Sequence, residues 1–274
     1  MLPIIYLFVP GDRPERFDKA LAGGADAVIL DLEDAVAPDH KAAARAAIER
    51  WGTAPAARDR LVLRINDAST PWYGDDLALA QRAGLACVML PKAEDPAQIA
   101  DARRRLPGAT VIALIETARG VQNVEAIAAA PGVQRLAFGT VDFAVDLGLS
   151  GDERGFAYAA SRIAIASRAA ELAAPIAGVT LALGDERQLQ ADLAFARACG
   201  FGAKLCIHPR QVEPVRRAFQ PSDAEIDWAR RVIAASRGGP GAVQVDGKLV
   251  DRPVLLHAQA ILGRAGNPAD PPAD

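Results

Sequence analysis

Short apolar runs alternate with alanine-rich segments that carry charges at helical spacing along most of the chain. The apolar runs predict strands at Tyr6–Val9, Ala27–Leu32, Leu61–Ile65, Ala86–Leu90, Val111–Ile115, Arg135–Phe138, Ile176–Thr180 and Ala203–Ile207. The segments between and after them predict helices at Arg13–Ala22, Lys41–Trp51, Asp75–Ala83, Pro96–Leu106, Val121–Ala129, Asp152–Ala173, Glu186–Ala198 and Pro209–Ala218. This regular alternation predicts a parallel α/β fold.

Eight strands alternating with eight helices match the size and order of a (β/α)8 barrel, a TIM barrel, over residues 1–219. A doubly wound open sheet is the alternative. No G-x-G-x-x-G motif follows the first strand, so the dinucleotide-binding form of that alternative has little support.

A smaller C-terminal appendage is predicted over residues 220–265, because this part is not needed to close a barrel. It contains a helix from Asp223 to Ser236, a hairpin around Asp246-Gly247 and a helix from Val254 to Leu262. The Gly238–Gly241 segment would link the first helix to the hairpin. The Pro/Ala/Asp-rich tail, residues 266–274, is predicted to be disordered.

Composition excludes several classes of partner. The formal charge of -3 from 31 basic and 34 acidic residues gives no electrostatic reason to expect nucleic acid or an anionic membrane. Three cysteines without metal-ligand spacing do not form a disulfide framework, and the N-terminus is too short and too interrupted by proline for a signal or spanning helix. We therefore expect a cytoplasmic protein.

Carboxylates follow two consecutive predicted strands. Glu116 comes directly after the run Val111–Ile115, and Asp142 follows the next strand after a glycine turn. In parallel barrels, ligands bind at the carboxyl ends of the strands. Hard oxygen donors without soft ligands favour magnesium or manganese over zinc, so Glu116 and Asp142 are the candidate metal ligands. Asp31 and Glu33, at the end of another strand, would hold metal-bound water.

Arg64 ends a further strand among these acids. Its planar fork can bind a substrate carboxylate at two points, while a metal polarises an adjacent carbonyl. That combination suits a 2-oxo acid such as oxaloacetate, glyoxylate or pyruvate, and a reaction that makes or breaks a carbon-carbon bond.

Each of these assignments has a structural alternative. The acids could be helix N-caps, and Arg64 could be only their ion-pair partner. Lys92 is interpreted as a salt-bridge partner in preference to a Schiff-base nucleophile, and Lys204, inside a strand, has an equally weak case as a nucleophile. His208, before Pro209, is interpreted as a helix-start residue.

The motifs at the strand ends, taken together, resemble the citrate lyase beta-subunit family, which includes malyl-CoA and citramalyl-CoA lyases and belongs with the HpcH/HpaI aldolases. The resemblance covers almost the whole chain. It is carried by Leu7–Pro14, Ala25–Val36, Arg64–Asn66, Leu90–Lys92, Ile115–Thr117, Phe138–Asp142, Ile207–Pro209 and Asp246–Asp251.

The resemblance implies a magnesium-dependent (β/α)8 barrel that acts on a CoA thioester and a 2-oxo acid. Glu116 and Asp142 match the family's metal ligands and Arg64 its carboxylate-binding arginine. Asp251 matches a C-terminal aspartate that acts as acid or base, often supplied by a neighbouring subunit. The Asp31–Asp34 loop and Lys41 match positions that bind substrate near the CoA entrance. Many members have Arg-Ser where this chain has Ile5-Tyr6, so a contact to the CoA phosphates is missing.

The expected reaction is cleavage, or formation, of a 3-hydroxyacyl thioester, giving an acetyl-CoA-like thioester and a 2-oxo acid, with citryl-CoA to acetyl-CoA and oxaloacetate as the leading example. A class II aldolase for free 2-oxo acids and a non-catalytic thioester-binding subunit are the alternatives. The resemblance also implies a homo-oligomer, trimer or hexamer, or a subunit of a citrate lyase complex. The identity of the thioester stays open.

Overall fold

Eight parallel strands form a closed barrel. The computed structural model describes residues 2–51, 58–150, 154–236 and 243–266. The strands are β1 Ile5–Pro10, β2 Ala27–Asp31, β3 Leu61–Arg64, β4 Cys87–Leu90, β5 Thr110–Ile115, β6 Val133–Phe138, β7 Ile176–Ala177 and β8 Ala203–Cys206. Each pairs in parallel with the next, and β8 pairs with β1. The predicted TIM barrel is confirmed.

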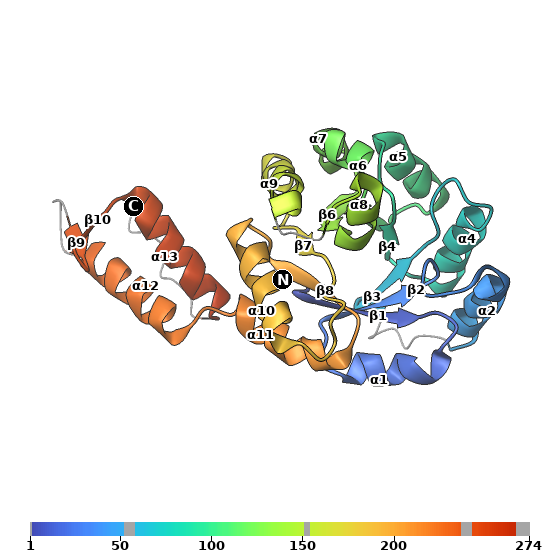
Figure 1. Cartoon of the computed structure of the whole chain (residues 1–274), viewed down its shortest axis with the longest axis horizontal. Helices are drawn as coiled ribbons and strands as arrows, with labels where there is room; N and C mark the ends of the chain where they lie inside the picture. The colour runs from blue at the N-terminus through green and yellow to red at the C-terminus, as the bar shows by residue number, and fades with distance from the viewer. Residues whose placement is uncertain (1, 52–57, 151–153, 237–242, 267–274) are drawn as a thin grey trace. The chain divides into compact units, whose positions relative to one another are not determined.

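Helices follow the strands and lie around the outside of the barrel (Figure 1). They are η1 Pro14–Arg16, α1 Phe17–Ala22, η2 Pro38–His40, α2 Lys41–Trp51, α4 Tyr73–Ala83, α5 Pro96–Arg105, α6 Ala118–Gln122, α7 Val124–Ala128, α8 Thr140–Leu147, α9 Arg154–Ala169, α10 Glu186–Ala198, η3 Pro209–Gln211 and α11 Val212–Phe219. Local signals fix several starts. Asp95 and His208 each begin a capping box, which confirms His208 as a helix-start residue.

The barrel interior is filled by side chains from alternate strand positions, as a two-residue period requires. The interior cluster is Tyr6, Ala27, Ile29, Val62, Met89, Ile112, Leu114, Ala137, Ile176, Ala203 and Leu205. The intervening strand residues face the helices, so the strands are apolar on both sides. The interior of the barrel is therefore a packed core that leaves no room for a ligand inside it.

Three elements differ from the sequence-based expectation. The predicted strand Ile176–Thr180 is only Ile176–Ala177, and the predicted helix Val121–Ala129 is two short helices, α6 and α7. Helix α8, Thr140–Leu147, was not expected at all. Its eight residues follow directly from a strand through one glycine, and the apolar pattern of so short a segment did not separate it from a loop.

The residues after the barrel form a second compact unit, Arg217–Asp274. It consists of α12 Asp223–Ser236, β9 Val243–Val245, β10 Lys248–Val250 and α13 Arg252–Arg264, packed around Ala229, Val232, Ala258, Ile261 and Leu262. The hairpin turns at Asp246 (φ 51°) and Gly247 (φ 73°), the left-handed pair that an Asp-Gly turn predicts. The linker Gly238–Gly241 and the predicted disordered tail after Gly266 lie outside the described residues.

Candidate active site

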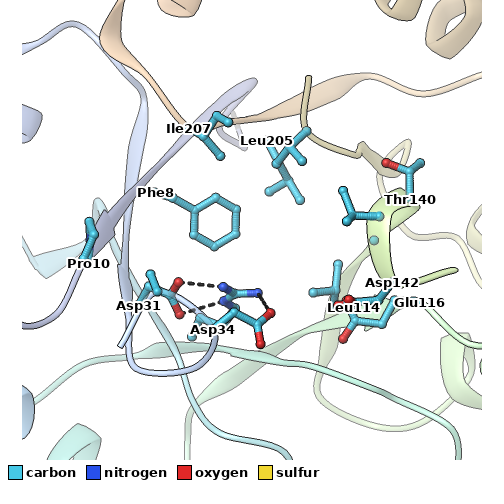
Figure 2. Close-up of a pocket in the computed structure, with 15 residues that line it drawn as sticks. Phe8, Pro10, Asp31, Asp34, Leu114, Glu116, Thr140, Asp142, Leu205 and Ile207 are labelled. Carbon is cyan, nitrogen blue, oxygen red and sulfur yellow. Dashed lines mark hydrogen bonds and ion pairs between the residues drawn. The ribbon is translucent and has the colours of Figure 1, made fainter. Parts of the chain in front are cut away.

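A cavity of about 370 Å³ opens where the barrel strands end. Its lining includes Phe8, Pro10, Asp31, Asp34, Arg64, Leu114, Glu116, Thr140, Asp142 and Ile207, from elements far apart in the sequence. Figure 2 shows Glu116 and Asp142 on one side of this cavity and Asp31 and Asp34 on the other. The structure thus brings together the carboxylates that the sequence placed only at strand ends.

Glu116 follows β5 and is only 2% exposed. Its Oε1 accepts a hydrogen bond from the backbone N–H of Lys92 at 2.8 Å. Lys92 has a φ of 45°, a left-handed conformation that a residue with a side chain rarely adopts. Burial, with the nearby charges of Glu33 and Asp142, raises the pKa of Glu116 to about 8 despite that hydrogen bond.

Asp142 follows β6 and Gly139, as the sequence predicted, and it lies in the first turn of α8. The turn into α8 requires glycine at position 139. A Cβ there would lie 2.3 Å from Oε2 and 2.6 Å from Cβ of Glu116. Gly139 therefore leaves the space in which the Glu116 side chain stands beside α8.

Arg64 ends β3 opposite Asp31, its partner in the β2–β3 register. Its Nε and Nη2 donate to the two oxygens of Asp31 at 2.7 and 2.6 Å, and its guanidinium lies 4.8 Å from the centre of the Phe8 ring. Burial alone would lower the pKa of Arg64, but the charge of Asp31 and its hydrogen bonds raise it well above its ordinary value. Arg64 is a fixed cation on the cavity wall.

Glu33 joins two cations at the same wall. Its Oε2 lies 2.9 Å from Arg64 Nη1, and its Oε1 accepts from Lys92 Nζ at 2.9 Å. Burial would lower the pKa of Lys92, but the bond to Glu33 raises it well above its ordinary value. A Schiff-base nucleophile needs a neutral amine, so the interpretation of Lys92 as a salt-bridge partner is confirmed.

Lys41 is not among the residues that line the cavity. Its side chain is buried, and Nζ donates to the carbonyls of Leu32 and Glu33 at 2.9 and 3.0 Å. Those carbonyls belong to the loop that follows β2. Lys41 therefore holds the backbone of the Asp31–Asp34 loop from beneath.

A second support was missed by the sequence analysis. Asn66 Nδ2 donates to Leu32 O at 3.0 Å and to Asp76 Oδ2 at 2.6 Å, and Arg45 donates to the same carboxylate's other oxygen at 3.0 Å. All of Asp76 is buried. The only sequence signal was Asn66 itself, two residues after Arg64, because Asp76 and Arg45 stand on helices that the pattern marks as ordinary amphipathic segments.

Asp251 belongs to the second unit, where its side chain accepts from the backbone N–H of Val254 at 3.1 Å and caps α13. This is the structural alternative for an acid at that position. The cap leaves the other carboxylate oxygen without a bond within the described residues, so the capping role and an acid/base role are compatible.

The charges at the cavity suit a divalent cation. Around the cavity, the two cations Arg64 and Lys92 stand against five carboxyl groups: Asp31, Glu33, Asp34, Glu116 and Asp142. No group of three or more His, Cys, Asp or Glu able to hold a metal occurs within the described residues. Magnesium needs only one or two protein carboxylates, so Glu116 and Asp142 fit it.

A TIM barrel with two carboxylates and a half-buried arginine at the carboxyl ends of its strands has the architecture of a TIM-barrel enzyme, whose active site lies at that end. The sequence profile of the HpcH/HpaI aldolase/citrate lyase family matches residues 5–209. The chain belongs to this family of carbon-carbon lyases.

Individual relatives cover nearly the whole chain. The citrate lyase subunit beta-like protein of Mycobacterium tuberculosis is 42% identical over 95% of both chains, and a (3S)-malyl-CoA thioesterase of Cereibacter sphaeroides is 34% identical over 94% of this chain and 93% of its own. The crystal structure of CitE from M. tuberculosis with magnesium, acetoacetate and coenzyme A has a TM-score of 0.86 at 41% identity, covering 96% of this chain and 98% of that one. No helix in the described ranges is long and apolar enough to cross a membrane.

Proposed function

We propose that this protein is a magnesium-dependent lyase that cleaves or forms the carbon-carbon bond of a 3-hydroxyacyl thioester. Cleavage yields a 2-oxo acid and an acetyl-CoA-like thioester, and the reverse reaction condenses these two compounds. The observation that carries this is the buried Glu116 and the half-buried Asp142, which line one cavity together with Arg64. A metal-binding acid pair opposite an arginine suits a substrate with a carboxylate next to a carbonyl or hydroxyl.

Arg64 would bind the substrate carboxylate with the end of its guanidinium. Asp31 occupies the Nε side of the fork. At Nη1 the bond to Asp34 is long, 3.4 Å, and the Asp34 side chain is 60% exposed. A substrate carboxylate can therefore replace Asp34 and bridge Nη1 and the remaining Nη2 proton, while Asp31 keeps the guanidinium in place.

Glu116 and Asp142 would hold the magnesium ion, and a bound ion would supply Lewis-acid polarisation of the carbonyl oxygen of the 2-oxo acid. Support comes from the M. tuberculosis CitE structure, which contains magnesium. Asp31 and Glu33 are less suited to hold metal-bound water than expected, because both are engaged by Arg64 and Lys92.

Cleavage of the carbon-carbon bond converts the 3-hydroxyl group to a carbonyl with loss of its proton, and releases a thioester enolate that must gain a proton at carbon. Condensation requires removal of that same carbon-bound proton. No histidine lines the cavity among the described residues. We assign this proton transfer to Asp251, supplied by the second unit of the same or a neighbouring chain. The Asp31–Asp34 loop, which Lys41 and Asn66 hold in place, would lie next to the carboxylate end of the substrate.

The test is a panel of citryl, malyl, citramalyl and hydroxymethylglutaryl thioesters of CoA, with magnesium, assayed at once for 2-oxo acid and for free CoA thiol. We expect that one thioester of the panel yields a 2-oxo acid without release of free CoA thiol, because the CoA product stays acylated. Citryl-CoA is the leading candidate. Glu116→Gln is the inactive control. Free 2-oxo acid substrates without CoA test the aldolase alternative.

Hydrolysis is a second candidate, because one relative is named a (3S)-malyl-CoA thioesterase. Its signature in the same panel is free CoA thiol without 2-oxo acid. If a thioester binds but neither product forms, the protein is a non-catalytic subunit. If no thioester binds and none yields a product, the proposal is refuted. A trimeric or hexameric assembly, or a citrate lyase complex, also remains part of this proposal.

A further inference from the structure

A second cavity lies beside the candidate active site, on the outer side of the barrel wall. It has a volume of about 500 Å³ and is enclosed by α8, α9, α10 and the segment that follows β7. It shares only Thr140, Val141 and Val179 with the first cavity. Figure 1 shows these elements on the β6–β8 side of the barrel. Its volume is in the range of small-molecule sites.

Small and aromatic residues explain why the space is open. Five alanines and Gly178 form part of the wall, where larger side chains would fill it. Four of the protein's eight phenylalanines supply the rest of the apolar surface: Phe138, Phe156, Phe195 and Phe201. Because β7 has only two residues, the segment after it stands away from the sheet. The cavity is therefore apolar on most of its surface.

The mouth of the cavity is also apolar. Val145 is 77% exposed and Leu181 is 64% exposed, and both line the opening. Exposed aliphatic side chains around a concave apolar site are typical of ligand-binding surfaces. The mouth is suited to the passage of an aliphatic chain.

One cation stands in this apolar surrounding. Lys204, on β8, is 2% exposed and lines the cavity, because its neighbours Ala203 and Leu205 take the positions inside the barrel. Its Nζ donates to the carbonyl of Gly178, which is its one hydrogen-bond acceptor in the described part of the chain. No carboxylate of a described residue forms an ion pair with it.

A buried ammonium with three donors and one neutral acceptor is incompletely satisfied. Burial lowers the pKa of Lys204 to about 8, partly offset by Cys206 and Asp192. Asp192 does not neutralise it directly, because that carboxylate accepts from Thr180 Oγ1 and from Gln188 Nε2 at 2.7 Å. The remaining donors of Lys204 need an anionic partner.

We propose that this cavity binds an aliphatic monocarboxylate, with its carboxylate on Lys204 and its chain against the phenylalanine-lined wall. A second carboxylate on the ligand is disfavoured, since Asp192 also lines the cavity and its negative charge would repel it. This selects against the short dicarboxylates that suit the Arg64 site. The chemistry is therefore that of a fatty acid and not that of an oxo-dicarboxylate.

The test uses the full chain and octanoate, with octan-1-ol and succinate as comparison ligands, in isothermal titration. Octanoate should bind saturably and succinate should not. Lys204→Met keeps an unbranched side chain that ends at Cε, and it removes only the charged amino group. It should weaken octanoate about tenfold or more while octan-1-ol binds as before, because only the carboxylate loses a charge-assisted hydrogen bond.

Matched variants separate this site from others. Ala160→Leu places a larger side chain in the cavity wall and should abolish binding of both octanoate and the alcohol, whereas Lys19→Met, at an exposed lysine, should change neither. Glu116→Gln should leave octanoate affinity unchanged. If Glu116→Gln abolishes binding, the octanoate occupies the active-site cavity and the proposal of a separate site is wrong.

A measurement on the wild-type chain covers the case in which Lys204→Met does not fold. Acetic anhydride acetylates accessible amines, and mass spectrometry reports each lysine. Octanoate should reduce acetylation of Lys204 severalfold and leave Lys19 unchanged. Equal modification of Lys204 with and without octanoate, or equal affinity of wild type and Lys204→Met, would overturn the assignment.

Discussion

Magnesium binding should release a proton from Glu116. Burial raises the pKa of this side chain from 4.5 to about 8, which corresponds to about 5 kcal/mol against ionisation. At pH 7 the metal-free side chain is then about 90% protonated. A metal ligand must be ionised, so binding at pH 7 should release about 0.9 proton.

Isothermal titration of Mg²⁺ at pH 7 in PIPES and in imidazole measures this number, because the two buffers differ in ionisation enthalpy. The affinity should also rise about tenfold per pH unit from pH 5.5 to pH 7.5 and become level above about pH 8. Glu116→Gln should remove the proton release and most of the affinity. Asp142→Asn should weaken binding but keep the release.

The same pKa sets the stability of the metal-free protein. Between pH 4.5 and about 8 the folded state keeps a proton that the unfolded state has lost. The stabilisation is therefore fully present below pH 4.5 and is lost as pH rises through about 8, at up to about 1.4 kcal/mol per pH unit. Urea unfolding should show this decline in the wild type and not in Glu116→Gln. Magnesium binding at pH 7 without proton release would show that Glu116 is already ionised, and the reasoning from burial would be refuted.

Three further predictions concern single positions. Arg64→Lys should lower kcat/KM for the 2-oxo acid at least about tenfold in steady-state kinetics, because an ammonium cannot replace two parallel hydrogen bonds, and unchanged kinetics would reduce Arg64 to a structural ion-pair partner. Gly139→Ala should abolish magnesium binding in titration, because the added Cβ displaces Glu116. Gly184→Ala is the control and should bind normally, because no heavy atom lies within 4 Å of its added Cβ. Normal magnesium binding by Gly139→Ala would contradict the packing argument. Asp251→Ala should lose activity and about 1 kcal/mol of stability, because it removes both the carboxylate and the helix cap. Asp251→Asn keeps the cap and should lose activity alone. An active Asp251→Asn enzyme would exclude an acid/base role. If the site is shared between chains, mixing Asp251→Asn with Glu116→Gln subunits should restore about one site in four after exchange.

The order of elements and the identity of the barrel could be predicted from the sequence because both depend on local signals. Strands such as Val111–Ile115 are apolar on both faces, α2 and α10 have clear helical periodicity, and Asp246-Gly247 specifies its turn. The predicted strand boundaries also placed Glu116 and Arg64 at strand ends. Their meeting in one cavity follows from closure of the barrel, since the carboxyl ends of all its strands lie on one side.

What the side chains do there was decided by tertiary structure. In the sequence Lys41 starts a predicted helix and Lys92 follows a strand, but neither position predicts the contacts of the side chain. Lys41 is buried beneath a loop, and Lys92 pairs with Glu33. Lys204 appeared to be an ordinary lysine within a strand, and only the packing of α8, α9 and α10 around a two-residue β7 places it in a largely apolar cavity. The raised pKa of Glu116 likewise arises from burial beside residues distant in the chain. The physical reason is the range of the interactions: hydrogen-bond patterns and hydrophobic periodicity are local along the chain, whereas burial and electrostatic environment depend on residues that only folding brings together.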